Sequence, residues 1–301
     1  MSLVDIATID AFAELFAGRT DAWGAVEGRS VQERVVSHHW AGHLIEPGHS
    51  MGIYPMLDNG MTHWGCSDID FGFEQSYPLA MNLRDALGAL GITSWVERTK
   101  GKGYHVWVFL DRDEWIHASY MRQALLVAHQ LAGVPPKEIN PKNPDPTKVS
   151  WGNYVNLPYA NDWMNTGKRC VINTYDELTL ERFVEEATDE TNNPNAIVDA
   201  AALYVPPPPE VAVAISEYDG SLEALTKRMG GLAYKIFREG PLPGKDRSTT
   251  MVRLMHCCKE GGFTPSEAMA VLDEFDTRFG KFVGRADREK ELTRMIQGVY
   301  G

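Results

Sequence analysis

Hydrophobic positions in the first two-thirds of the chain follow two different periods. Segments that alternate between apolar and polar residues predict β-strands, and segments with apolar residues three or four apart predict helices. The predicted strands are 52–57, 63–71, 94–98, 104–110, 154–157 and 169–172, and the predicted helices are 30–44, 78–90 and 115–132. The strands at 94–98 and 104–110 form a predicted hairpin. This mixture indicates an α+β domain.

The last third of the chain has only the helical period. The predicted helices are 221–238, 248–260, 265–279 and 286–300. Before them stands a run of four prolines at 206–209, which favours an extended, semi-rigid spacer. We therefore expect an α+β domain at 1–205, a proline-rich linker at 206–213 and a small all-α domain at 214–301.

Two aspartates stand two residues apart on the apolar strand at 63–71. Alternation along a strand places Asp68 and Asp70 on the same face, with Cα atoms roughly 6.5 Å apart. Carboxylates aimed at one place repel each other unless a cation lies between them, and Mg²⁺ prefers carboxylate oxygens. Two solvated aspartates on an open sheet face would explain the pattern equally well.

The turn of the predicted hairpin is rich in glycine and in positive charge. Arg98, Lys100 and Lys102 stand among two glycines directly before His105, which begins an apolar strand. Such a turn can present backbone N–H groups and cations to phosphates. The alternative is an ordinary basic turn followed by a histidine of the core.

A third acid follows in a loop that contains lysine and proline. Glu138 could complete a three-carboxylate site, with Lys142 near a phosphate. An exposed glutamate in such a loop is common, so this segment alone indicates little.

The order of these segments resembles the archaeo-eukaryotic primase superfamily, and in particular the primase-polymerases of phages and mobile elements. That family has Asp-x-Asp/Glu on an apolar strand, small-x-His on a following strand, and a later acid. Asp68-Ile69-Asp70 and Gly103-Tyr104-His105 match the first two motifs. Glu138 is the candidate for the third, although Lys137 precedes it where the pattern has an apolar residue. The segments at 42–57 and 152–158 are similar to the flanks of the family motifs.

The resemblance implies a fold and a set of roles. The fold would be a core with an RRM-like sheet and an N-terminal α/β unit, followed by a helical domain like the PriCT domains of these proteins. It also implies two Mg²⁺ or Mn²⁺ ions and nucleoside triphosphate substrates. The implied metal ligands are Asp68, Asp70 and Glu138, with Asp145 and Asp162 as alternatives for the third, and the implied nucleotide contacts are His105, Arg98, Lys100, Lys102, Lys142 and His43.

Charge is distributed unevenly along the chain. The net charge is −12, but residues 211–301 carry 14 Lys+Arg against 13 Asp+Glu, and the segment 227–259 holds eight basic residues and two acids. That segment could bind a single-stranded DNA template or primer, or it could be a solvated surface. With four cysteines without metal-ligand spacing and neither a signal peptide nor an apolar run of membrane length, the sequence predicts a soluble, cytoplasmic protein.

The sequence thus favours a DNA primase-polymerase, a nucleotidyltransferase that makes primers on single-stranded DNA and extends them. One alternative is a replication-initiation or DNA-binding protein on a primase scaffold without catalysis. Another is a metal-dependent nuclease, because carboxylates and two metals also cleave phosphodiesters. No Walker A motif occurs, so a replicative helicase partner would be a separate chain or a part that has been trimmed away.

Overall fold

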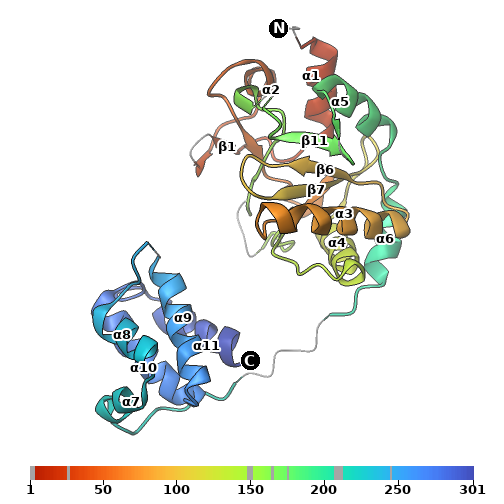
Figure 1. The fold of residues 1–301 in the computed structure, drawn as a ribbon. Coiled ribbons are helices and arrows are strands. Elements are labelled where there is room, and N and C mark those ends of the chain that lie inside the picture. The colour runs from red at the N-terminus through yellow and green to blue at the C-terminus, as the bar shows by residue number, and fades with distance from the viewer. Residues whose placement is uncertain are drawn as a thin grey trace. The chain divides into compact units, whose positions relative to one another are not determined.

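The computed structural model describes residues 4–25, 28–147, 152–163, 166–174, 176–206, 213–244 and 246–301. The chain divides into two compact units, Met1–Val205 and Pro206–Gly301, which Figure 1 shows as an α+β body and a helical body. Each unit has its own hydrophobic core. Most of the predicted linker, at 207–212, lies outside the described residues.

The first unit is built around a six-stranded sheet in which all neighbouring strands are antiparallel, in the order β12-β11-β6-β7-β5-β9. Its central part runs β-α-β-β-α-β along the chain, which is the RRM-like arrangement that the resemblance implied. The elements of this part are β5 (Trp64–Ile69), α3 (Phe73–Ala89), β6 (Trp95–Arg98), β7 (Tyr104–Phe109), α4 (Ala118–Ala132) and β9 (Glu138–Asn140), and the sheet continues through β11 (Cys170–Asn173) and β12 (Asp176–Glu177).

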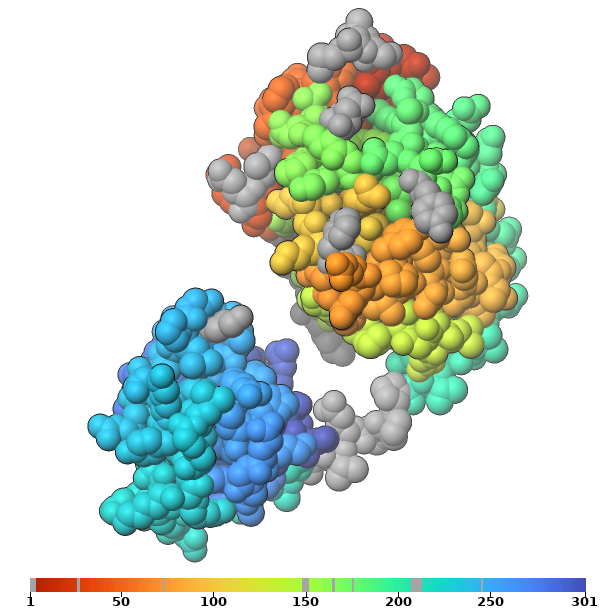
Figure 2. Space-filling model, in the orientation of Figure 1, coloured from red at the N-terminus to blue at the C-terminus, as the bar shows by residue number. Residues whose placement is uncertain are grey.

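Helices α3 and α4 cover one face of this sheet (Figure 1). A side chain at Gly65 of β5 would lie 2.6 Å from Met121 of α4, so the glycine allows the helix to approach the strand closely. The hydroxyl of Ser67 lies 3.1 Å from the ring of His129 on the same helix. In the space-filling view, α3 forms much of the surface on the side shown (Figure 2).

The opposite face is only partly covered by helices. Phe16, directly after α1 (Ile6–Leu15), packs edge-on against Trp107 and Phe109 of β7, with ring centroids 5.0 Å apart in both pairs. Phe183 of α5 (Leu180–Asp189) joins the same cluster. These aromatic contacts cover the half of the face that lies away from the hairpin turn, and a cleft lies over the other half.

Smaller elements complete the first unit. A four-stranded sheet has the order β10-β3-β1-β2, and β4 pairs with β8. Helix α6 packs against α4. The bounds are β1 (Trp23–Ala25), β2 (Arg29–Val31), α2 (Ser37–Ile45), β3 (Gly52–Ile53), β4 (Met61–Thr62), β8 (Ile116–His117), β10 (Val155–Asn156), η2 (Asn161–Trp163) and α6 (Pro194–Ala202).

The second unit is entirely helical in its described part. Its helices are α7 (Leu222–Arg228), α8 (Gly231–Glu239), α9 (Arg247–Glu260), α10 (Pro265–Phe279) and α11 (Arg288–Tyr300). Helix α10 begins as the sequence predicts, because Thr264 caps it and Glu267 closes the capping box. None of the described helices is long and apolar enough to cross a membrane.

The predicted α+β class with a helical C-terminal part is confirmed, but several predicted elements differ. The predicted helix 30–44 is β2 followed by α2, and the predicted helix 221–238 is interrupted between α7 and α8, where Gly230 and Gly231 disfavour a continuous helix. Helix α3 begins at Phe73, five residues before Pro78, so this proline lies inside the helix and not at its start as the sequence predicted. The acidic segment at 176–199 contains two helices that the sequence did not reveal.

Candidate active site on the central sheet

Four titratable side chains form a row across four neighbouring strands. Glu97 on β6 pairs with His105 on β7, His105 pairs with Asp68 on β5, and Asp68 pairs with Glu138 on β9. Residues directly opposite each other in antiparallel strands lie on the same face, about 4.5–5.5 Å apart at their Cβ atoms. The sheet register therefore gathers residues from distant parts of the sequence on the face away from α3 and α4.

A cleft of about 220 Å³ lies over three members of this row, Glu97, His105 and Asp68. It is lined from β5 and its end, from the hairpin turn between β6 and β7, from β10 and from the start of β11, by Asp68, Asp70, Glu97, Thr99, Lys100, Gly101, Lys102, Gly103, His105, Asn156 and Arg169. The structure thus brings the Asp-x-Asp strand and the basic glycine turn of the sequence to one place.

Asp68 is the carboxylate at the centre of this cleft. Burial raises its pKa, although the neighbouring His105 acts in the opposite direction. No hydrogen bond or ion pair to its carboxylate is found among the described residues. A half-buried carboxylate without a donor is unfavourable by itself, so its position suits an incoming cation.

The other two predicted acids each face a lysine. Lys137 donates to the backbone carbonyl of Asp70 at 2.6 Å and lies 3.1 Å from its carboxylate. Glu138 accepts a hydrogen bond from Asn153 at 3.1 Å, and its other oxygen lies 3.6 Å from the ammonium of Lys142. Lys137, which departs from the family pattern, therefore supplies a cation beside the second aspartate of the motif.

The three carboxylates have the donor chemistry of a site for a hard divalent cation. In the arrangement described, however, no three His, Cys, Asp or Glu side chains among the described residues already enclose an ion. Asp70 and Lys137 are each about half exposed, at 49%, so their pairing can open without disturbing the core. Asp68, whose carboxylate has no donor among the described residues, fits the metal directly, whereas Asp70 and Glu138 fit it after their lysines move away.

The hairpin turn approaches the Asp-x-Asp strand closely because residue 103 is a glycine. A Cβ at Gly103 would lie 2.7 Å from the carbonyl oxygen of Ile69 and 3.2 Å from the Cβ of Asp70. A side chain there would push the turn away. This contact gives a physical reason for the small residue two positions before His105, and it holds Lys100 and Lys102 at the rim of the cleft.

His105 is held from behind by Glu97. Its Nδ1 donates to Oε2 of Glu97 at 2.8 Å, and the indole N–H of Trp107 donates to the same oxygen at 2.9 Å. Burial alone would lower the pKa of His105, but the Glu97 carboxylate and, less strongly, Asp68 raise it overall. The arrangement favours a positively charged imidazole in the cleft.

The sequence did not single out Arg169 and Asn156, which also line the cleft. Arg169 precedes β11, is 5% exposed and donates to the hydroxyl of Ser50. Burial lowers its pKa, and no carboxylate forms an ion pair with it in the described part of the chain. A buried arginine facing a cleft without a carboxylate partner suits an anion such as phosphate.

Three of the residues predicted to contact the nucleotide do not line the cleft, namely Arg98, Lys142 and His43. Arg98 donates to the carbonyl of Gly167 and to Glu177 of β12, because it alternates with Glu97 and faces away from the row. Lys142 lies beside Glu138 at the sheet edge. The structure therefore ties Arg98 to β12 and gives it a role in the fold.

The structure also contradicts the predicted nucleotide contact of His43. It is fully buried, its Nε2 donates to the carbonyl of Pro158 at 2.7 Å and its Nδ1 accepts the amide of Met51 at 3.0 Å. Burial lowers its pKa to about 4, so it is neutral. With both ring nitrogens used, His43 links α2 to the segment after β10 and has no atom left for a nucleotide.

The two alternative third acids have local partners. Asp145 accepts from the amide and hydroxyl of Thr147 within a turn. Asp162 accepts the amide of Gly48 at 2.9 and 3.1 Å. Glu138 pairs directly with Asp68 in the sheet and neither of these residues does, so Glu138 is the better candidate.

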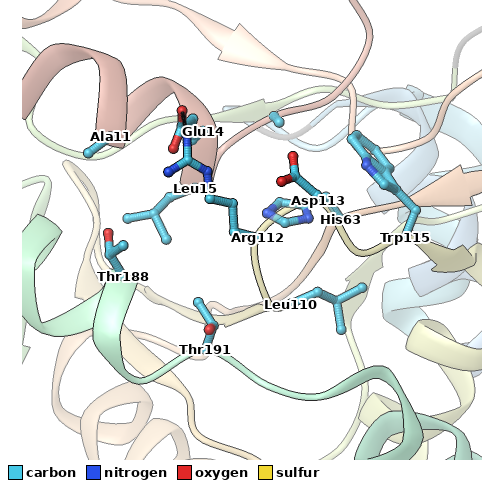
Figure 3. Close-up of a pocket in the computed structure, with 11 residues that line it drawn as sticks. Ala11, Glu14, Leu15, His63, Leu110, Arg112, Asp113, Trp115, Thr188 and Thr191 are labelled. Carbon is cyan, nitrogen blue, oxygen red and sulfur yellow. Dashed lines mark hydrogen bonds and ion pairs between the residues drawn. The ribbon is translucent and has the colours of Figure 1, made fainter. Parts of the chain in front are cut away.

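A second, smaller pocket of about 120 Å³ lies where α1, α5 and the end of β7 meet (Figure 3). Arg112 and Glu14 form an ion pair at 2.8 Å there, and the ring of His63 donates to the carbonyl of Glu114 at 2.8 Å. Arg112, Glu14 and His63 thus have partners within the protein, and the described residues of this pocket do not repeat the row of carboxylates and histidine found in the first cleft.

The fold and the cleft define a protein of the archaeo-eukaryotic primase class. A protein-family model described as the archaeo-eukaryotic primase domain of the TOTE conflict system matches residues 25–183, which is more than half of the chain and includes the row and the cleft. The chain belongs to this family. A search of curated proteins finds no match.

Proposed function

We propose that this protein is a DNA primase-polymerase, which joins nucleotides on a single-stranded DNA template in a metal-dependent reaction. The observation that carries the proposal is the carboxylate of Asp68, which has no donor among the described residues and lines a cleft with His105, Lys100 and Lys102. In the sheet, Asp68 is in register with His105 and with Glu138. Membership of the archaeo-eukaryotic primase family supports the same class of reaction.

In this proposal Asp68, Asp70 and Glu138 bind Mg²⁺ or Mn²⁺. The chemistry that such ions supply is a lowered pKa for the attacking 3′-hydroxyl and neutralisation of charge on the triphosphate and the departing pyrophosphate. Lys137 and Lys142 would release Asp70 and Glu138 as the site fills.

The cations of the cleft would hold the triphosphate. Arg169 is buried and His105 is partly buried, whereas Lys100 and Lys102 are exposed on the turn, and all four line the cleft. Charge-assisted hydrogen bonds from these groups would align the phosphates with the carboxylates, so that most of the barrier reduction comes from positioning and electrostatics. Template and primer DNA are the proposed partners.

The test is synthesis on single-stranded DNA with labelled ribo- and deoxynucleotides in Mg²⁺ and in Mn²⁺, with and without a primer. Asp68→Asn should abolish incorporation, and Asp85→Asn, an exposed aspartate of α3 paired with Arg84, should leave it unchanged. Products that persist in Asp68→Asn would overturn the proposal.

Two other outcomes would assign another function. DNA binding without incorporation on either template would indicate a non-catalytic DNA-binding protein on a primase scaffold. Release of nucleotide fragments without added triphosphates would indicate a nuclease. Extension of the primed template alone would retain the nucleotidyl transfer and remove the priming step.

A further inference from the structure

Glu97 is a carboxylate inside the protein that no motif of the sequence includes. It lies in the middle of β6, is 1% exposed and stands between Val96 and Arg98. A carboxylate withdrawn from water is costly unless donors satisfy it. Its retention beside the cleft therefore needs a physical reason.

Two side chains of the neighbouring strand β7 donate hydrogen bonds to the carboxylate of Glu97. Nδ1 of His105 and Nε1 of Trp107 both donate to Oε2 of Glu97, at 2.8 and 2.9 Å. Glu97 and His105 are direct partners in the antiparallel register, and Trp107 follows two residues later on the same face. Sheet pairing thus fixes the contact between Glu97 and His105 without any loop.

The indole of Trp107 is itself immobilised. It is fully buried, and its ring packs against Phe16 at 5.0 Å and Trp64 at 5.2 Å between centroids. A rigid tryptophan that donates to Glu97 keeps the carboxylate at one place on β6. The fixed carboxylate of Glu97 in turn fixes the orientation of the His105 imidazole.

A bond at Nδ1 determines what the other edge of the ring can do. The proton on Nδ1 is fixed by Glu97, so Nε2 lies at the opposite edge of the ring from the carboxylate. His105 lines the cleft together with Asp68 and Lys100, and no hydrogen bond to its Nε2 is found among the described residues. The edge without a partner is thus the one available to a ligand.

We infer that Glu97 is a positioning residue of this site, which holds His105 through Nδ1 and presents its Nε2–H to a phosphate oxygen of the bound triphosphate. The inference rests on the proposed function, since it names the residue that orients one of its phosphate donors. Glu97 acts only through His105 and does not touch the substrate. A purely structural Glu97 would affect folding without changing how the protein uses His105.

The first experiment measures binding of dATP and ATP in the presence of Mn²⁺ to the full chain. We expect Glu97→Gln, which keeps the shape but removes the charge, to raise the Kd about tenfold, as loss of one charge-assisted hydrogen bond would. Glu185→Gln is the matched control, because Glu185 is an exposed glutamate of α5 in the same unit and should leave the Kd unchanged.

A double-mutant cycle separates positioning from a merely structural role. If Glu97 acts through His105, then Glu97→Gln should have no further effect on the Kd in a protein that already carries His105→Gln. Additive effects of the two substitutions would overturn the inference, and so would a wild-type Kd in folded Glu97→Gln.

The second experiment needs neither a Glu97 variant nor a nucleotide. Ring ¹⁵N shifts of the wild-type protein, with His105 assigned through the loss of its signal in His105→Gln, should show Nδ1 protonated. A His105 ring protonated only at Nε2 would overturn the inference even if Glu97→Gln does not fold. Wild-type protein that binds neither nucleotide while His105 is protonated at Nδ1 would instead overturn the proposed function and, with it, the role of Glu97 in presenting His105.

Discussion

Asp68 in the sheet cleft and Asp276 in the helical unit are both aspartates withdrawn from water, but they differ in the hydrogen-bond donors around their carboxylates. Asp276 is buried on α10, and it accepts the backbone amides of Lys281 and Phe282 at 2.9 and 2.8 Å and the guanidinium of Arg288 at 2.8 Å. Asp68 is partly buried and has no donor among the described residues.

The two pKa shifts follow from this difference. Burial raises the pKa of both carboxyls, but at Asp276 the donors more than offset it, so the pKa of Asp276 is lowered while that of Asp68 is raised. The comparison indicates that a buried carboxylate with a complete set of hydrogen-bond donors stabilises the fold. One without donors is kept at a cost to stability, which is typical of a site that binds something.

The largest expected effect is a loss of stability on replacing Asp276, whose carboxylate has three hydrogen-bond donors. Asp276→Asn removes the charge that three donors were placed to meet, so we expect the helical unit to lose about 3 kcal/mol of unfolding free energy. All eight tryptophans lie at or before residue 163, so their fluorescence reports the first unit alone, whereas far-ultraviolet circular dichroism reports both. Only the dichroism transition should shift, and Asp219→Asn, at an exposed position, should shift neither.

The same carboxyl makes the helical unit sensitive to acid. Because the folded pKa of Asp276 is lowered, its contribution to stability is present above the unfolded pKa of about 3.9 and is lost as pH falls through the folded value. Equal acid stability of wild type and Asp276→Asn would contradict the structural role given to this residue.

A second prediction concerns a substitution that displaces the hairpin turn beside the cleft without changing any charge. In Gly103→Ala the new methyl group would meet the carbonyl of Ile69, so we expect a loss of about 1–3 kcal/mol in the first unit and weaker triphosphate binding. Gly101→Ala is the matched control, since a Cβ at Gly101 would meet nothing within 4 Å. Tryptophan fluorescence during urea unfolding measures the first effect and nucleotide titration the second. Equal stability of the two variants would contradict the close approach of the turn.

A third prediction removes cations of the cleft. Replacing Lys100 and Lys102 together by alanine should raise the Kd for a triphosphate about tenfold or more and leave stability unchanged, because both side chains are exposed on the turn. The same charge change at Lys235 and Lys290, exposed on the helical unit, should leave that Kd unchanged. Equal effects of the two pairs would indicate general electrostatic attraction in place of a local site.

The smallest expected effect is on the stability of Asp68→Asn. Because the folded pKa of Asp68 is raised, its contribution is favourable below the unfolded pKa of about 3.9 and is lost as pH rises through the folded value. At pH 7 the substitution should therefore leave the first unit equally stable or more stable, by less than about 1 kcal/mol. Fluorescence-detected urea unfolding at pH 7 checks this, and a marked destabilisation would show that Asp68 has a donor in solution.

Much of the fold and part of the cleft follow from local sequence. Alternation predicts the strand of Asp68, the hairpin and their basic turn, and helical periodicity predicts α9 and α10 within one residue. These predictions depend only on neighbours in the chain. The break between α7 and α8 could have been predicted from the two adjacent glycines.

The parts that sequence did not reveal depend on contacts between distant residues. Glu97 is recognisable as an acid within a short predicted strand, but only the register shows that His105 lies opposite it. Arg169 lies before a weak strand, and its place in the cleft follows from the pairing of β11 with β6. No local pattern contains either pairing.

The basic segment at 227–259 illustrates the same limit for charge. Lys227 pairs with Glu223 and Arg228 with Glu267. Arg247 donates to carbonyls at the C-terminal end of α10, and Lys259 donates to the carbonyl of Val299. Lys245 lies outside the described residues. A count of positive residues thus overstates what this segment can offer to DNA, which remains a prediction.

The cross-strand row has a consequence for how this protein can vary in length. Segments between the strands can gain or lose residues without changing which side chains face each other, since the pairing alone sets the row. A single residue deleted within β9 would turn Ile139 toward the cleft and Glu138 toward the helices, because alternate positions exchange faces. Insertions should therefore be tolerated in the connections and rejected inside the three-residue strand that carries the third acid.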